Sequence, residues 1–157
     1  MSVAVAIPGG PDLELRHLVL DYNGTVALDG RLAEGVARRL EALGKQLQIH
    51  VLTADTFGRA RNELNGVNCR LVVLEGADEH RQKAEYVDRL GAASVVAIGN
   101  GRNDRTMLER AALAIAVLGP EGLATEALAA ADIAVPDPIA ALELLLNPRR
   151  IAATLRS

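Results

Sequence analysis

Residues 17–25, His17-Leu18-Val19-Leu20-Asp21-Tyr22-Asn23-Gly24-Thr25, decide the fold of this chain. The apolar run before Asp21 is typical of a strand buried on both faces of a parallel sheet. Asp21 stands where this strand ends, and in α/β sheets carboxylates at strand ends face the ligand crevice. Turn chemistry alone leaves a second interpretation open, because Asp21 followed by Asn23 and Gly24 also suits a simple turn that leaves a strand.

Apolar runs of similar length recur along the chain and alternate with helical patterns. The expected strands are 3–7, 17–20, 47–52, 70–74, 94–98, 113–117 and 132–135. The expected helices are 32–43, 57–64, 79–90, 103–111, 121–130 and 138–146. This order predicts an α/β fold with a doubly wound, mainly parallel sheet and its sites at the carboxyl ends of the strands. A chain of 157 residues suits one domain, 1–157.

Three local patterns refine the predicted order of strands and helices. Phe57, Ala60 and Leu64 share one helical face, and their helix is expected to stop at Asn65-Gly66. Asp29-Gly30 predicts a tight two-residue hairpin that would form a small flap over the site. The segment 3–7 is expected to be an edge strand followed by a turn.

Composition excludes several classes of protein. Seventeen basic and twenty acidic residues give a net charge of −3, and aromatic content is 2%, so neither a basic footprint nor stacking platforms favour nucleic-acid binding. No apolar run approaches the ~20 residues of a membrane span. The single Cys69 has no disulfide partner and is interpreted as a packing residue. We therefore expect a cytoplasmic protein with no membrane partner.

Three further segments carry polar groups at positions that suit a site. Thr53 ends the next core strand, although Thr53 or Asp55 could equally cap a helix. Residues 99–104, Gly99-Asn100-Gly101-Arg102-Asn103-Asp104, link a buried strand to a helix, and Asn103 or Asp104 could likewise be only a cap. Lys83 in isolation is indistinguishable from a surface lysine.

Together these segments resemble the four ordered motifs of the haloacid dehalogenase-like superfamily, which includes the phosphorylation domain of P-type ATPases. The match covers residues 18–117 and uses 21–25, Thr53, Lys83 and 99–104. Four motifs in order, each in the expected structural context, are more specific than any one of them. The resemblance implies a Rossmann-like α/β domain and a Mg²⁺-dependent phosphohydrolase or phosphotransferase.

The resemblance also assigns roles. Asp21 would be the nucleophile that becomes an aspartyl phosphate, and Lys83 would neutralise charge during the transfer. The implied catalytic residues are Asp21, Asn23, Thr53 and Lys83. The implied phosphate-binding residues are Gly24, Thr53, Ala54, Lys83 and Asn103. The implied Mg²⁺ ligands are Asp21, Asn23 through its backbone carbonyl, and Asn100, with Asp104 near or in the coordination shell.

Two positions depart from the family pattern. Hydrolytic members usually have an aspartate at the position of Asn23, where it serves as general acid and base; an amide cannot carry the proton, so slow hydrolysis is expected. Asn100 stands where an aspartate usually binds the metal, which predicts weaker Mg²⁺ binding. A non-catalytic phosphate-binding or regulatory module is therefore the alternative function.

Spacing sets the expected access to the site. About thirty residues separate Asp21 from Thr53 and Thr53 from Lys83, and helices and a strand already use them, so no cap domain is expected. The large nucleotide-binding insert of P-type ATPases is also missing, which excludes ATP-driven transport. We expect an open site for a small phosphorylated substrate, which a neighbouring subunit of a homo-oligomer would cover.

Overall fold

The computed structural model describes residues 1–55 and 58–157. Its central sheet has six parallel strands in the order β10-β9-β8-β3-β6-β7. The strands are β3 (His17–Asp21), β6 (Gln48–Thr53), β7 (Arg70–Val73), β8 (Val95–Gly99), β9 (Leu113–Val117) and β10 (Ile133–Val135). The prediction of a doubly wound α/β sheet is confirmed, and β3 lies in the middle of it.

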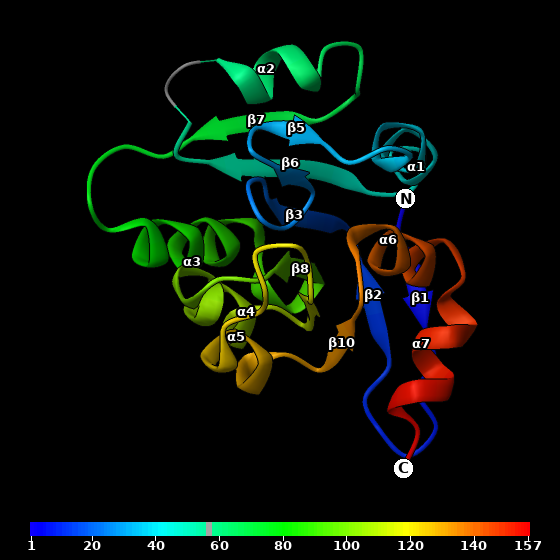
Figure 1. Cartoon of the computed structure of the whole chain (residues 1–157). Coiled ribbons are helices and arrows are strands. Elements are labelled where there is room, and N and C mark those ends of the chain that lie inside the picture. The colour runs from blue at the N-terminus through cyan, green and yellow to red at the C-terminus, as the bar shows by residue number, and fades with distance from the viewer. Residues whose placement is uncertain (56–57) are drawn as a thin grey trace.

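Helices cover both faces of the sheet (Figure 1). One face carries α1 (Val36–Leu43), α6 (Pro138–Leu146) and α7 (Pro148–Leu155). The other carries α3 (Glu79–Leu90), α4 (Arg105–Arg110) and α5 (Thr125–Ala130). Because side chains alternate along a strand, Leu18 and Leu20 pack into the first layer and Val19 into the second. β3 is therefore buried on both faces, as its apolar run predicts.

The amino-terminal strand lies outside the central sheet, which corrects the expectation of an edge strand at 3–7. β1 (Val3–Val5) pairs antiparallel with β2 (Leu13–Leu15) in a separate hairpin. Its inward-facing Val3, Val5 and Leu15 join the core layer of α7, and the Ser157 N–H donates to the Pro8 carbonyl. Two three-residue strands thus extend the hydrophobic layer instead of the sheet.

A second hairpin follows β3 directly, as the sequence predicts. β4 (Ala27–Leu28) and β5 (Arg31–Leu32) are antiparallel, and the turn residues Asp29 and Gly30 have φ of 51° and 83°. Positive φ at both positions is the requirement of a type I′ turn, which Asp-Gly satisfies. The buried Tyr22 hydroxyl donates to the Gly30 carbonyl at 2.8 Å and holds this flap against the end of β3.

The helix predictions differ in outcome. The expected bounds 79–90 and 138–146 match α3 and α6. α5 begins at Thr125 and not at Glu121, because Gly122 has φ +85° and its N–H closes a turn onto the Gly119 carbonyl. α2 (Arg59–Glu63) buries Ala60, and Phe57 lies outside the described residues.

Two short 3₁₀ turns stand on either side of β8. The 3₁₀ turns are Ala92–Ser94 and Arg102–Asp104, and the second leads directly into α4. Within residues 1–55 and 58–157, no helix combines the length and the apolar character that crossing a membrane requires.

Candidate active site

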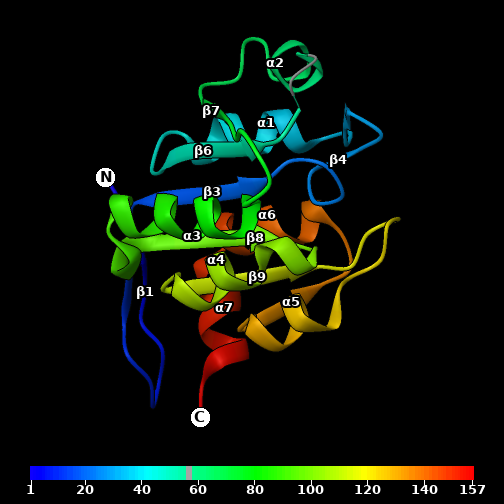
Figure 2. The ribbon, with the colours of Figure 1, turned by 90° about the vertical axis from the view of Figure 1, so that its left-hand side faces the viewer.

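Asp21 occupies the centre of the carboxyl edge of the sheet. It is the last residue of β3, which lies between β6 and β8, so the ends of three parallel strands meet around it. Figure 2 shows the β4–β5 hairpin and the loop after β9 on this same side of the sheet. Parallel strands therefore bring together the segments that lie far apart in the sequence.

A buried lysine joins the carboxylates of two motifs. Lys83, on α3, is 1% exposed, and its Nζ lies 2.8 Å from Asp21 Oδ1 and 2.8 Å from Asp104 Oδ1. Lys83 is therefore not a surface lysine, because α3 packs against the sheet with this side chain directed to the strand ends. Removing one partner of such a buried group leaves an uncompensated charge, so the arrangement is costly to break.

The electrostatics of the three side chains follow from burial and proximity. Burial raises the pKa of Asp21 to about 7, with the negative charge of Asp104 acting in the same direction against Lys83 and Thr25. Burial alone would lower the pKa of Lys83, but the Asp21 and Asp104 carboxylates raise it above its usual value. Lys83 is thus a permanent cation at neutral pH. Asp21 is a carboxylate whose ionisation depends on nearby positive charge.

Asp104 is held by backbone groups. Its Oδ2 accepts hydrogen bonds from the N–H groups of Asn100 and Gly101, both at 2.9 Å, while Oδ1 faces Lys83. A Cβ built on Gly99 would lie 2.6 Å from Asp104 Cγ, so only glycine fits at the end of β8. With 0% exposure and both oxygens engaged, Asp104 positions Lys83 and the 99–104 turn. Its Oδ1 accepts only from Lys83 and keeps a second lone pair.

Thr25 connects Asp21 to Asn100. Its Oγ1 lies 3.2 Å from Asp21 Oδ2 and 3.0 Å from Asn100 Oδ1, and all three residues are buried. Two oxygens with lone pairs, one from the end of β3 and one from the end of β8, therefore lie on either side of a single hydroxyl. Sequence reasoning included Thr25 in the motif without assigning it a role.

Thr53 and Asp55 each accept a backbone hydrogen bond in the segment from the end of β6 to the start of α2. Thr53 is 3% exposed, and its Oγ1 accepts from the Asp55 N–H at 3.0 Å, which shapes the turn after β6. Asp55 Oδ2 accepts from the Ala60 N–H at 3.1 Å and so satisfies a donor in the first turn of α2. Neither residue is the N-cap of α2, which is Gly58. Thr53, the exposed Ala54 and Asp55 lie beside Asp21 in the same pocket.

Asn23 and Gly24 both make hydrogen bonds with the β4–β5 hairpin. The Asn23 side chain is exposed, and its Oδ1 accepts from the Gly30 N–H at 3.1 Å, so it also holds the flap. The Gly24 N–H donates to the Ala27 carbonyl at 2.7 Å. That N–H is therefore directed into the hairpin. Gly24 contributes by its missing side chain, because a Cβ there would lie 2.8 Å from Asn100 Nδ2.

A pocket of about 450 Å³ opens above these groups. Its lining residues come from five loops at the strand ends and are Asp21, Asn23, Thr53, Ala54, Asp55, Glu79, Asn100, Gly101, Asn103 and Glu121. Asn103 is exposed and donates through Nδ2 to Glu79 at 2.9 Å. Lys83 and Asp104 lie beneath the pocket. Sequence reasoning missed Glu79 and Glu121, whose positions become visible only when the loops are placed.

The donor chemistry of the pocket fits a hard divalent cation. Among the described residues, no cluster of three or more His, Cys, Asp and Glu side chains forms a ready metal centre. Oxygens of Asp21 and Asn100 nevertheless lie close together, beside the loop that carries Asn23. Mg²⁺ prefers few protein oxygens and several waters, so this sparse set suits it.

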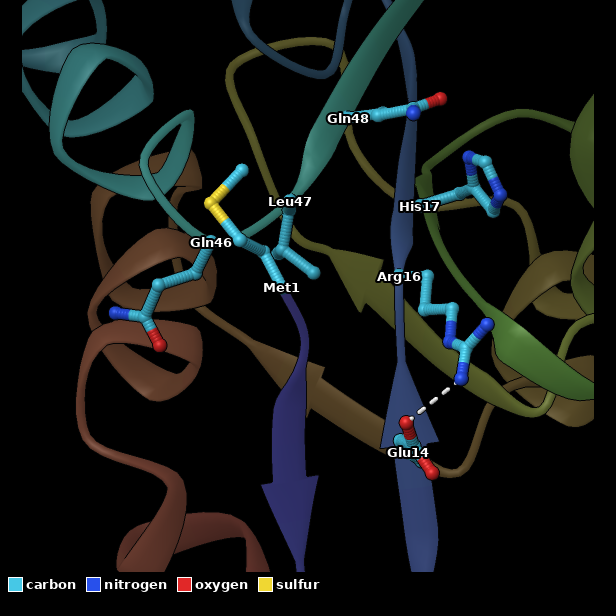
Figure 3. Close-up of a pocket in the computed structure, with 7 residues that line it drawn as sticks. All are labelled: Met1, Glu14, Arg16, His17, Gln46, Leu47 and Gln48. Carbon is cyan, nitrogen blue, oxygen red and sulfur yellow. Dashed lines mark hydrogen bonds and ion pairs between the residues drawn. The ribbon is translucent and has the colours of Figure 1, made fainter.

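A second cavity of about 450 Å³ lies at the opposite end of β3 and β6 (Figure 3). It is lined by Met1, Glu14, Arg16, His17, Gln46, Leu47 and Gln48. Arg16 pairs with Glu14 at 2.9 Å, and both side chains are 61% exposed. Arg16 and Glu14 offset each other's charge, and this cavity lacks the buried carboxylates and lysine of the pocket at Asp21.

Comparison with known proteins identifies relatives of uncharacterized function. No known protein-family model matches the chain. An uncharacterized protein of Methanocaldococcus jannaschii is 47% identical over 62 residues, which cover 40% of this chain and 67% of that protein. A second uncharacterized protein of the same organism is 49% identical over 39 residues, which cover 25% of this chain and 89% of that protein.

Solved structures identify the fold. The 3-deoxy-D-manno-octulosonate 8-phosphate phosphatase of Moraxella catarrhalis, solved with magnesium, phosphate and KDO, has a TM-score of 0.70 and 15% identity; the match covers 88% of this chain and 92% of that one. A putative HAD superfamily hydrolase of Legionella pneumophila has a TM-score of 0.71 at 15% identity, with 90% and 87% covered. The chain therefore has the haloacid dehalogenase-like fold, and it belongs to one family with the archaeal protein that it matches at 47% identity.

Proposed function

We propose that this protein is a Mg²⁺-dependent phosphatase or phosphotransferase that forms an aspartyl phosphate at Asp21. The observation that carries the proposal is the buried Lys83, which lies 2.8 Å from both Asp21 and Asp104 beneath an open pocket at the strand ends. The magnesium, phosphate and KDO bound to the structurally similar phosphatase of Moraxella catarrhalis support the same chemistry on this fold.

The reaction begins with Asp21. A carboxylate oxygen of Asp21 attacks the phosphorus atom of the substrate, the bond from phosphorus to the leaving oxygen breaks, and an aspartyl phosphate forms. Water then attacks the phosphorus, which releases inorganic phosphate and returns the Asp21 carboxylate. If another acceptor hydroxyl replaces water, the same intermediate gives a phosphotransferase.

Positioning and charge account for most of the catalysis in such a transfer. Lys83 keeps Asp21 oriented and partly neutralises the negative charge that gathers on the nucleophile and the phosphoryl group. The Thr53 hydroxyl and the Ala54 N–H stand at the turn after β6, beside Asp21, where they can donate to phosphoryl oxygens. Asn103 is a further donor at the rim.

The residues that would hold Mg²⁺ are Asp21, Asn100 and the backbone carbonyl of Asn23. When bound, the cation would offset the negative charge of the phosphoryl oxygens and favour the ionised form of Asp21, whose pKa burial raises to about 7. Asp104 supports this site by holding Lys83 and the turn that presents Asn100. The substrate is a small phosphate ester or an acyl phosphate, in a pocket that a second copy of the chain would cover.

Asn23 makes the second step slow. Its amide cannot take up and release the proton that the leaving group and the attacking water need, and its side chain is bonded to Gly30 in the flap. Loss of general acid and base assistance typically lowers rates by about 10²–10⁴-fold. We expect acyl phosphates to phosphorylate Asp21 faster than alkyl phosphate esters do, because their leaving groups do not require a proton in the first step.

The test is a steady-state assay of phosphate release from acetyl phosphate and p-nitrophenyl phosphate, with Mg²⁺ and with EDTA. We expect slow, Mg²⁺-dependent release that disappears in Asp21→Asn. Equal release by the wild type and Asp21→Asn would contradict the proposal.

Asn23 also favours a second candidate function, a phosphate-binding regulatory module without turnover. Its side chain holds the flap through the Gly30 N–H, and its amide cannot carry a proton. Calorimetry with Mg²⁺ and inorganic phosphate separates the two functions. Binding without any phosphoryl transfer from acetyl phosphate would favour the module.

A further inference from the structure

Glu121 is a pocket residue that neither the motifs nor their resemblance assigns. It lies in the loop between β9 and α5, and its side chain lines the pocket together with Asp21 and Asn100. Figure 2 shows this loop, in yellow, on the same side of the sheet as the β4–β5 hairpin. The side chain is exposed, so its carboxylate is accessible from the pocket.

The glycine at position 24 locates the carboxylate. A Cβ built on Gly24 would overlap Glu121 Oε2 and would lie 2.8 Å from Asn100 Nδ2. The Glu121 carboxylate and the Asn100 amide therefore flank one spot above the Gly24 backbone. Any side chain at position 24 would displace them, and φ of +79° already favours glycine there.

Asn100 itself fixes the loop that carries Glu121. Its Nδ2 donates to the Gly122 carbonyl at 3.4 Å, and its backbone carbonyl accepts from the Ala124 N–H at 2.9 Å. A Cβ on Gly119 would lie 3.3 Å from the Gly24 carbonyl oxygen, so the loop also contacts the turn after β3. Glu121 is thus at the tip of a turn whose two sides are tied to the site.

The buried groups around Asp21 carry little net negative charge for a divalent cation. Lys83 is shared by Asp21 and Asp104, so these three buried groups together carry a net charge of only about −1 when both carboxylates are ionised. Asn100 contributes a neutral oxygen, and both Asp104 oxygens already accept hydrogen bonds. A divalent cation beside Asp21 would therefore keep a net positive charge of about +1 without another carboxylate.

We propose that Glu121 supplies this charge and sets the affinity of the site for a divalent cation. The inference rests on the proposed function and deepens it. An amide at position 100 can donate to the Gly122 carbonyl, whereas an aspartate there would repel that carbonyl. The neutral Asn100 side chain adds no charge to the site, but its hydrogen bond to Gly122 holds the loop that places the Glu121 carboxylate there.

The test measures binding of Mg²⁺ alone to the full chain by calorimetry, so that it does not depend on turnover. Glu121→Gln should weaken Mg²⁺ binding by about tenfold, the size expected of one charge at close range in an open pocket. Glu79→Gln is the matched control, because it removes a carboxylate that lines the pocket but already accepts from Asn103. Its effect should stay within about threefold.

A double variant that moves the carboxylate from position 121 to position 100 gives a second test. The double variant Asn100→Asp with Glu121→Gln moves the carboxylate back to the strand end, and it should recover Mg²⁺ affinity to within about threefold of the wild type. Thermal melting confirms that each variant is folded. If Glu121→Gln binds Mg²⁺ as the wild type does, or if Glu79→Gln is equally damaging, the inference is wrong while the proposed function stands. If the wild type binds no Mg²⁺, both are overturned.

Discussion

Two polar networks connect β3 to α3, one at each end of this strand. At the carboxyl end, Asp21 of β3 meets Lys83 of α3 in a charged group. Near the amino end, His17 of β3 lies 3.2 Å from His50 of β6, whose other ring nitrogen lies 2.7 Å from the Tyr86 hydroxyl of α3. Tyr86 follows Lys83 by three residues, so one helical turn separates the two networks.

The networks differ in what burial does to them. Burial lowers the pKa of His50 to about 4, helped by His17 and Arg70, so the histidine chain is neutral at physiological pH. In the other network, burial raises the pKa of Asp21 to about 7 while Lys83 stays charged. Neutral hydrogen bonds satisfy a core at low cost, whereas buried charges rarely improve stability over apolar packing. The charged network is therefore the one that requires a functional explanation.

The largest effect is expected from removing the cation of the charged network. Lys83→Met leaves two buried carboxylates without their cation and should lower the free energy of unfolding by about 3–5 kcal/mol. It should also abolish phosphoryl transfer. Chemical denaturation at neutral pH measures the first effect, and the exposed Lys45→Met is the matched control. A loss below about 1 kcal/mol would mean that the two carboxylates are not both charged.

Adding a proton carrier next to the charged network should have the next largest effect. Asn23→Asp keeps an acceptor for the Gly30 N–H and restores general acid and base assistance. Phosphate release from p-nitrophenyl phosphate should rise by about 10²–10⁴-fold. Asn65→Asp is the control, because Asn65 also precedes a glycine but lies outside the pocket. An unchanged rate in Asn23→Asp would show that proton transfer does not limit turnover.

The pH dependence of stability distinguishes the networks by sign. In EDTA, folded Asp21 with a pKa of about 7 binds a proton that the unfolded chain, with a pKa of about 3.9, does not. Its contribution is therefore lost as pH rises through 7. Asp21→Asn should remove this slope between about pH 4 and 7 in denaturation measurements, and the exposed Asp29→Asn should not.

His50 should give the opposite slope. The unfolded histidine has a pKa of about 6.5 and the folded one a pKa of about 4, so only the unfolded chain takes up a proton between these values. Stability should therefore fall as pH drops from about 6.5 toward 4. His50→Gln should flatten this dependence, while the exposed His80→Gln leaves it unchanged. A slope that survives in His50→Gln would assign the acid sensitivity to other groups.

The sequence predicts the elements that have a clear apolar or turn pattern. Continuous apolar runs predict the central strands, and the Asp29-Gly30 pair predicts the hairpin with its positive φ values. α7 was missed because Arg149 and Arg150 suggest a solvated end, although Pro148 begins a helix that buries Ile151. β2 was missed because three residues carry too little periodicity.

In the candidate site, the sequence predicts the residues at strand ends but not those that packing or loops position. Asp21, Thr53 and Asn100 stand at strand ends, and the parallel topology alone brings them together. Lys83 could be recognised only through its place among the motifs, because its burial is a property of packing. Glu121 could not be predicted, since a loop carries it and its position depends on contacts with Gly24 and Asn100.

The proposed function requires that Asp21 accepts a phosphoryl group. The most direct measurement is mass spectrometry of protein that has reacted with acetyl phosphate and Mg²⁺ and been quenched in acid, in which aspartyl phosphates persist. We expect one added phosphoryl group, located on the peptide that contains Asp21 and absent from Asp21→Asn and from EDTA controls. Intact unmodified protein, or a phosphoryl group on another residue, would contradict it.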